Sequence, residues 1–297
     1  MDKLKGLLAV AMLRMSALLP LSMSRALGRY FAVVYWPLGG RSRKVTEKNI
    51  AAAYPELSPK EQYKLAKRSL GATGELVGEM GHIWLKPWDY VSTLILEVHG
   101  AELFERAQSE GRGVVLLAPH LGNWEILGLH MATLGESVAL YQPPKLLALR
   151  SLIKTARQRN GTRVAPTTRR GLVSLLSSVK NGNFSGILPD QVPQDLNAGE
   201  NSVFMGLPCF TATLASNIIR RTGAVALLGV AVRVPGGFVI RYEPADVAIY
   251  SDDNTKSLAA VNAGVEQCLR YCPEQYQWEY KRFRARPKVA PGFYDDL

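Results

Sequence analysis

Cysteine is scarce in this sequence, and no apolar run is long. Cys209, Cys268 and Cys272 are an odd number without a metal-binding spacing, so we expect reduced thiols and no metal site. No stretch reaches the ~18 to 20 uncharged apolar residues that span a bilayer, which excludes a polytopic membrane protein. The G-x-S-x-G elbow of serine hydrolases and the G-x4-GK[ST] phosphate loop are also missing.

Acidic residues are absent from one long segment. The chain has 36 Lys and Arg against 25 Asp and Glu, a net charge of +11. Between Ser137 and Pro189 there is no Asp or Glu to neutralise the bases. The bases of this segment are Lys145, Arg150, Lys154, Arg157, Arg159, Arg163, Arg169, Arg170 and Lys180. We expect the segment to face anionic partners, with a solvated surface as the alternative.

The first 40 residues mix apolar pieces with bases. Arg14 interrupts the apolar centre that a cleavable secretory signal needs. An N-terminal helix with bases near the headgroups and leucines in the acyl region would associate with an anionic leaflet. The alternative is a helix packed on the protein's own core. We therefore divide the chain into an N-terminal membrane anchor, residues 1–40, and a single α/β domain, residues 41–297.

Strand and helix patterns alternate through the rest of the chain. A capping box at Ser58 to Glu61 predicts a helix that runs to about Trp84. Short apolar runs predict strands at 93–98, 113–118, 137–141, 185–188 and 224–234. Helical patterns lie near 101–109, 123–134, 147–159, 169–180, 211–222 and 255–271. Phe238 to Tyr242 follows a Pro-Gly-Gly turn and predicts a hairpin partner for the preceding strand. The pattern predicts an α/β fold with a central, mainly parallel or mixed sheet flanked by helices.

The junction after the 113–118 strand carries His120 and Glu125. On one continuous helix these side chains would point about 140° apart. If His120 instead lies in the turn, eased by Gly122, and Glu125 in the first helical turn, the carboxylate can reach and orient the ring. An imidazole held in this way can accept a hydroxyl proton at neutral pH. His82 and His130, in apolar helical patterns, are interpreted as structural.

Four sequence blocks stand out between about residues 100 and 287. The blocks are Pro119 to Glu125, of the H-x4-D/E type; Tyr141-Gln142-Pro143 with Arg157 to Gly161 and Arg170-Gly171; Leu188 to Gln191, followed by Phe204-Met205-Gly206 and Thr211; and a closing signature, Pro273 to Pro287. Together they resemble the late lipid A acyltransferase family, the lauroyl and myristoyl transferases of Gram-negative bacteria. Two positions depart from the pattern. Gln191-Val192-Pro193-Gln194 follows Asp190 where the family often has a second acidic residue and a glycine, and Cys209 replaces a small residue.

The resemblance implies a glycerolipid-acyltransferase-like fold and a secondary acylation step of lipopolysaccharide biosynthesis. The enzyme would move a fatty acyl chain from acyl carrier protein to a hydroxyl of an anionic lipid A precursor. The reaction would take place at the cytoplasmic face of the inner membrane, among its lipids. The thioester of the carrier is the donor, and no cofactor, metal or nucleic acid is expected.

The resemblance also suggests roles for individual residues. His120 would deprotonate the acceptor hydroxyl and Glu125 would hold its ring. Arginine side chains would meet phosphates or the acidic carrier, namely Arg157, Arg159 and Arg170. Asp190 would bind a sugar hydroxyl or hold one of these arginines. Asn123 would donate to the oxyanion or cap the helix.

Alternatives from other classes remain. A nucleic-acid binder would be basic too, but it gives the anchor-like segment and the His/Glu pair no role. An acyltransferase for another glycolipid, such as a mannosylated phosphoinositide, is the nearest alternative reaction. A non-catalytic membrane-binding module is the alternative without chemistry.

Overall fold

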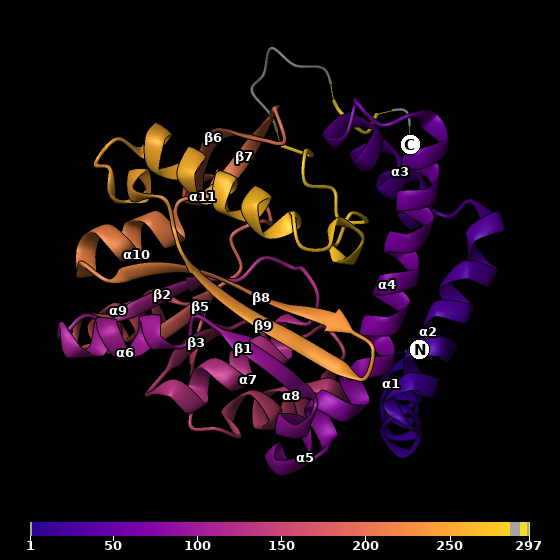
Figure 1. Ribbon diagram of the computed structural model, residues 1–297, viewed down its shortest axis with the longest axis horizontal. Coiled ribbons are helices and arrows are strands. Elements are labelled where there is room, and N and C mark those ends of the chain that lie inside the picture. The colour runs from indigo at the N-terminus through magenta and orange to yellow at the C-terminus, as the bar shows by residue number, and fades with distance from the viewer. Residues whose placement is uncertain (1, 286–291, 296) are drawn as a thin grey trace.

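A five-stranded sheet lies at the centre of the computed structural model, which describes residues 2–285, 292–295 and 297 (Figure 1). The strands run in the order β1-β9-β8-β2-β5. Their bounds are β1 Ile95–His99, β2 Val114–Leu117, β5 Phe184–Ile187, β8 Val225–Val234 and β9 Gly237–Pro244. Within this sheet β8 and β9, joined by a tight turn, pair antiparallel, and the other neighbours are parallel. The predicted mixed, mainly parallel sheet and its hairpin are therefore confirmed.

Helices cover both faces of this sheet. Their bounds are α4 Pro59–Leu85, α5 Trp88–Thr93, α6 Glu102–Ser109, α7 Trp124–Leu134, α8 Leu147–Gln158, α9 Arg169–Lys180, α10 Leu214–Thr222 and α11 Asn254–Leu269. Strand β2 shows the two-sided packing: Val115 and Leu117 join a core cluster with α10 and α11, whereas Val114 and Leu116 join one with α6 and α7. Alternate side chains of a strand point to opposite faces, so an uninterrupted apolar run is needed here.

Two small sheets were not expected from the sequence. β3 Val138–Tyr141, predicted as a strand of the main sheet, pairs instead with β4 Arg163–Pro166. β6 Gly199–Phe204 and β7 Leu207–Ala212 form a hairpin, so the helix expected from residue 211 begins only at Leu214. The hairpin turns at Met205 and Gly206, both with positive φ. The glycine was the only available turn signal, and one glycine is a weak one.

The N-terminal residues form α1 Asp2–Leu18, α2 Leu21–Tyr35, a short 3-10 turn and α3 Arg41–Ala53. Among the described residues, no helix is long and apolar enough to cross a membrane. The predicted N-terminal membrane helix is therefore not supported as a span. Instead, α2 lies along α4 (Figure 1). Their backbones meet at Gly28 and Gly74, where a Cβ on either residue would come within 2.0 to 2.2 Å of the other's carbonyl oxygen. One face of α2 thus packs on the protein's own core.

Candidate active site

His120 lies in the turn between β2 and α7, as the sequence predicted. Gly122 has φ +60°, and a Cβ there would lie 2.1 Å from the carbonyl oxygen of Ala231 on β8. Only glycine allows both the left-handed conformation and this close approach. The turn is thus held against the sheet, with the His120 side chain 15% exposed.

The carboxylate that contacts the His120 ring belongs to Asp190. Its Oδ1 is 2.8 Å from Nδ1 of His120, and its Oδ2 accepts from the backbone N–H of His120 at 2.9 Å. His120 follows β2 and Asp190 follows β5, and these strands are parallel neighbours. Their carboxyl ends meet at one edge of the sheet, which is where ligands bind in α/β folds. The two contacts assign a proton to Nδ1 and leave Nε2 free to accept one.

The buried Asp190 carboxylate is kept ionised. Burial raises its pKa, but the positive charge that the His120 ring carries when protonated and the two hydrogen bonds from His120 outweigh burial, and the net pKa is lowered. The side chain is only 2% exposed. A buried ionised carboxylate at Nδ1 is suited to stabilise the imidazolium that forms when Nε2 of His120 takes up a proton.

The structure differs from the prediction that Glu125 orients the His120 ring. The Glu125 carboxylate binds Arg157 of α8 through both oxygens, with Nε to Oε2 at 3.0 Å, and accepts from the Trp84 indole at 3.2 Å. Because Asn123 caps α7, Glu125 lies in the first helical turn and points toward α8 and α4. A catalytic role for Glu125 stays a prediction. In this structure Glu125 would act on the reaction through Arg157.

Arg157 forms an ion pair with Glu125 and is also partly exposed to solvent. Burial lowers its pKa, but Glu125 raises it more, so the net pKa is raised. Its side chain remains 35% exposed. Together with Glu125 it borders a cavity of about 110 Å³ between β2, β5 and α7. The cavity is otherwise largely apolar, lined by Leu116, Ala118, Leu127, Leu129, Met131, Leu140 and Leu188, among others.

On the open side of the ring, an amide occupies the position that a substrate hydroxyl would need. Nε2 of Gln191 lies 3.2 Å from Nε2 of His120 and 3.5 Å from Oε1 of Gln277. The Trp124 ring and the imidazole form an edge-to-face contact, with centroids 4.8 Å apart. Sequence reasoning did not assign these three residues to the site. All three lie within the quoted blocks, which was the available signal.

The closing signature packs beside the His120 turn. The backbone N–H of Gln277 donates to the His120 carbonyl at 3.1 Å, and that of Gly122 donates to the Gln275 carbonyl at 3.1 Å. This contact explains how a C-terminal motif belongs to the same site as an H-x4-E motif. Its last two residues, Arg286 and Pro287, lie outside the described residues.

The other predicted site residues have structural partners or lie exposed. Asn123 is fully buried: Oδ1 accepts from Ile126 N–H at 3.1 Å, so the capping alternative is what the structure shows. Arg159 donates to carbonyls at the end of α4, including Trp84 at 2.6 Å, and not to Asp190. Arg170 is exposed in the first turn of α9. Substrate roles for these residues stay predictions.

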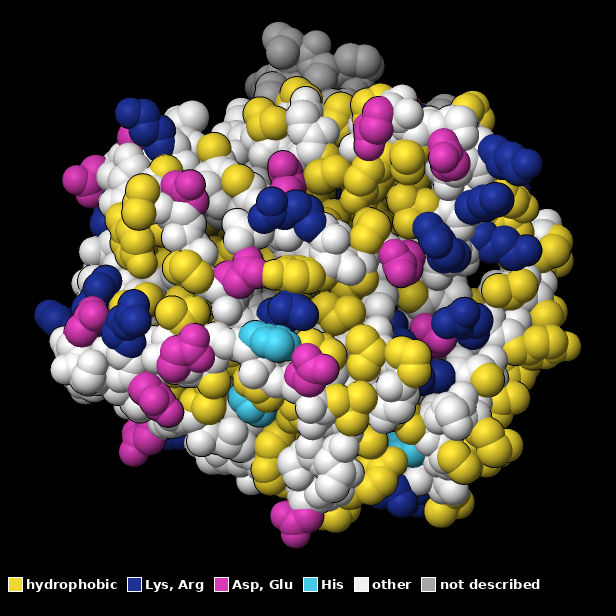
Figure 2. All heavy atoms as spheres, viewed as in Figure 1, with side chains coloured by type: hydrophobic (Ala, Val, Ile, Leu, Met, Phe, Trp, Pro, Cys, Tyr) yellow, Lys and Arg dark blue, Asp and Glu magenta, His cyan; other side chains and the backbone are white. Residues whose placement is uncertain are grey.

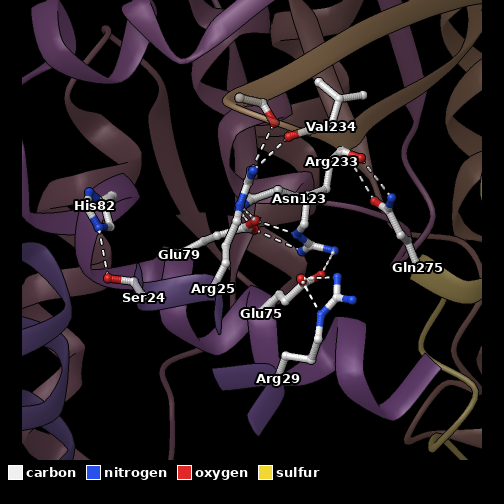
Figure 3. Close-up of polar contacts among 11 residues, drawn as sticks. Ser24, Arg25, Arg29, Glu75, Glu79, His82, Asn123, Arg233, Val234 and Gln275 are labelled. Atoms are coloured by element: carbon white, nitrogen blue, oxygen red, sulfur yellow. Dashed lines mark hydrogen bonds and ion pairs between the residues drawn. The ribbon is translucent and has the colours of Figure 1, made fainter. Parts of the chain in front are cut away.

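A buried ion cluster, formed by Arg25, Glu75, Glu79 and Arg233, lies beside Asn123 (Figure 3). Glu79 of α4 is fully buried and accepts from Arg25 at 2.7 Å and from Arg233 Nη2 of β8 at 2.9 Å. It also accepts from Nδ2 of Asn123 at 2.9 Å, at the start of α7. The cluster therefore connects α2, α4 and β8 to the turn that carries His120.

The buried position of Arg25 differs from what the sequence predicted for the N-terminal bases. They were expected near lipid headgroups, but Arg25 is 7% exposed and points inward. Its remaining N–H groups donate to the carbonyls of Val234 and Gly237 at 2.8 and 2.9 Å. Arg25 points inward because α2 packs one face on α4. The buried carboxylate of Glu79 on that helix is stabilised by a cation beside it.

His82 and His130 are structural, as interpreted. His82 contacts the hydroxyls of Ser24 and Tyr90 at 3.2 and 2.8 Å, and His130 contacts the Tyr242 hydroxyl at 2.8 Å. Burial lowers the pKa of both rings.

The fold and site together have the form of an α/β enzyme with a histidine–carboxylate pair at adjacent strand ends. The chain belongs to the bacterial lipid A biosynthesis acyltransferase family, whose model matches residues 3–285. It is 26% identical over 260 residues to the lipid A biosynthesis lauroyltransferase of Escherichia coli K12, covering 86% of this chain and 83% of that protein. It is 25% identical over 271 residues to the palmitoleoyltransferase of the same organism, covering 90% and 87%. A Haemophilus influenzae lipid A biosynthesis acyltransferase is 25% identical over 266 residues, covering 86% and 79%. The resemblance is confirmed: the protein is an acyltransferase of lipid A biosynthesis.

Proposed function

We propose that this enzyme moves a fatty acyl chain from the thioester of acyl carrier protein to a hydroxyl of an anionic lipid A precursor, without a further cofactor. One observation carries the proposal: Asp190 holds Nδ1 of His120 at 2.8 Å and so leaves Nε2 to receive a proton. The relatives' names, lauroyltransferase and palmitoleoyltransferase, support a fatty acyl group as the cargo.

The reaction follows from this geometry. Nε2 of His120 takes the proton of the acceptor hydroxyl, whose oxygen attacks the thioester carbonyl carbon. Asp190 stabilises the imidazolium while the tetrahedral intermediate exists. When the carbon–sulfur bond breaks, the imidazolium returns the proton to the departing thiolate. The acceptor hydroxyl must first displace the Gln191 amide from Nε2.

Arg157 is proposed to contact the anionic part of a substrate or intermediate. Two of its N–H groups bind Glu125, which fixes the plane of the guanidinium. The others are available to an oxygen at the 110 Å³ cavity. Glu125 is thus proposed as a positioning residue. A chain of typical fatty acid length needs more room than this cavity, which would hold only part of it.

The protein is proposed to work at the cytoplasmic face of the inner membrane. Large apolar side chains are exposed on α1, α2 and the turn after them. They are Leu4, Leu7, Leu8, Met12, Met15, Leu18, Met23, Leu27, Tyr30, Phe31, Val34, Tyr35 and Leu38. Such a surface suits a protein that lies on one leaflet without crossing it.

Mass spectrometry of the acceptor after incubation with acyl carrier protein thioesters tests the function. An added fatty acyl mass is expected with the wild-type enzyme and not with His120→Ala. Unchanged transfer by His120→Ala, with its melting temperature preserved, would remove the general-base assignment. Lipid binding without transfer from a carrier or coenzyme A thioester would favour the non-catalytic module. Transfer only to a mannosylated phosphoinositide would favour the other glycolipid.

A further inference from the structure

An apolar groove of about 990 Å³ lies between the N-terminal helices and α4. We call it the N-terminal groove. Its walls come from α1, with Met12 and Met15; from α2, with Leu27 and Phe31; and from α4, with Val77. None of the described residues that line it is acidic. Its volume lies at the upper end of the ~300–1,000 Å³ of small-molecule sites, and its apolar walls suit hydrocarbon.

The groove lies within the most apolar part of the surface. Its walls α1 and α2 are the helices that expose the large hydrophobic side chains proposed to meet the bilayer. Figure 2 shows hydrophobic side chains along this edge of the molecule, with Lys and Arg side chains near the end of α2 that leads to α3. A hydrocarbon chain could therefore enter the groove directly from a leaflet, without passing through water.

One end of the groove carries positive charge. Gly40, Arg41, Ser42 and Arg43 line it there, at the start of α3. Among the described residues, no side chain caps this helix and its first turn contains no acidic residue. Helix N-termini carry partial positive charge, so arginines there are unfavourable without an anion. Arg43 binds Glu47 at 2.9 Å, but the Arg41 side chain has no hydrogen bond or ion pair with a described residue.

We propose that the N-terminal groove binds an anionic glycerophospholipid of the bilayer. One acyl chain lies between α1, α2 and α4, and the phosphate lies at the start of α3 beside Arg41. The acyl chain of such a lipid would cover the apolar walls, and its phosphate would neutralise the positive charge at the start of α3. This lipid is a ligand rather than a substrate, and it fixes how deeply the enzyme lies in the leaflet. The inference uses the proposed membrane association but not the transfer reaction.

Native mass spectrometry of the full-length protein tests this proposal. Protein in neutral detergent is incubated with phosphatidylglycerol or with phosphatidylcholine, and the retained lipid is counted. One phosphatidylglycerol is expected on the wild type. Val77→Trp fills the groove and should lower retention at least tenfold. Arg41→Gln should remove the preference for phosphatidylglycerol over phosphatidylcholine.

A matched control is available on the outer face of α2. Val34 is 49% exposed and does not line the groove, so Val34→Trp should retain lipid as the wild type does. Met15→Trp fills the groove from α1 and serves as a second variant if Val77→Trp does not fold. Melting temperatures identify variants that have lost the fold.

Two results would overturn the proposal. Retention by Val77→Trp and Met15→Trp at the wild-type level would show that the lipid binds elsewhere. A raised KM for the acylated acceptor in these variants, with unchanged phosphatidylglycerol retention, would assign the groove to the acceptor instead. Inactivity of the wild type in acyl transfer, with the expected lipid pattern, would contradict the proposed function and leave this inference standing.

Discussion

At the scale of single residues, His120 is positioned by a carboxylate 70 positions away rather than by the one five positions away. The sequence identified His120 correctly, because a histidine after a buried strand is recognisable in one dimension. It named Asp190 at a strand end but could not pair the two. That pairing depends on β5 lying next to β2, and strand order is a property of the whole sheet. The sequence-based prediction paired His120 with Glu125 because separation along the chain was the only available guide to proximity in space.

Asp190→Asn should lower kcat by about 10²- to 10⁴-fold with little change in KM. The amide keeps the shape but carries no charge to stabilise the imidazolium. Steady-state kinetics with an acyl carrier protein donor measure both constants. Glu125→Gln is the contrasting variant: it loosens Arg157 and should mainly raise KM. A larger kcat loss in Glu125→Gln than in Asp190→Asn would restore the sequence-based assignment.

Glu279→Gln should stabilise the protein at neutral pH. Burial of this carboxyl raises its pKa above the usual value, although its hydrogen bond from Thr73 and the His120 charge oppose the change. Its Oε2 is buried without a hydrogen-bond partner among the described residues. The folded state therefore holds the proton more tightly than the unfolded state, and stability falls as pH rises from the unfolded pKa to the folded one.

The measurement is the melting temperature of wild type and Glu279→Gln between pH 4 and 8. The variant should gain about 2 °C at pH 7.5 and little at pH 4. An equal change at both pH values would show that ionisation of Glu279 is not the cause.

At the scale of elements, α2 behaves as part of the core and as part of the surface at once. Its exposed face was predictable from the apolar pieces and bases of the sequence. Its buried face was not, because Arg25 looks like any other N-terminal base until α4 brings Glu79 beside it. The helix α4 was predicted well because a capping box and a long pattern mark it locally. α3, β4 and the β6–β7 hairpin lack such local marks.

Arg25→Met should lower the free energy of unfolding by about 3–5 kcal/mol, because it leaves buried groups unpaired. Glu79 loses one partner, and the carbonyls of Val234 and Gly237 lose their donors. Arg29→Met is the matched control. Arg29 pairs with Glu75 but is 63% exposed, so its loss should cost about 0–1 kcal/mol. Urea unfolding compares the two, and equal losses would contradict a special role for Arg25.

At the scale of the whole molecule, the apolar N-terminal surface and the net charge of +11 support the proposed docking on an anionic leaflet. Deleting the first 35 residues would remove this surface, but it would also remove Arg25 from the core. Point substitutions on the outer face therefore test docking more cleanly. The bases of the acid-free segment add charge, although Arg157 and Arg159 already have partners within the protein.

Leu7→Gln with Leu18→Gln should weaken binding to anionic vesicles by about tenfold per leucine, because each inserted side chain contributes over 1 kcal/mol. The two leucines are 66% and 82% exposed. Co-sedimentation with vesicles measures the loss, and added salt should weaken binding of all variants. Leu196→Gln, at an exposed leucine outside α1 and α2, is the control. If Leu196→Gln weakened vesicle binding as much as the double variant does, docking would not be specific to the N-terminal surface.

The bond between Arg25 and Gly237 also sets an order of events during synthesis. These residues are 212 positions apart, and β9 and β8 lie between β1 and β2 in the sheet. At about 5–20 residues per second, a ribosome needs ~10–40 s to make the partners that bury Arg25. During this interval α1 and α2 have left the ribosome, while the sheet behind them is incomplete. The proposed docking of their apolar faces on the bilayer can therefore precede completion of the sheet, and we expect the nascent chain on membranes before the enzyme is complete.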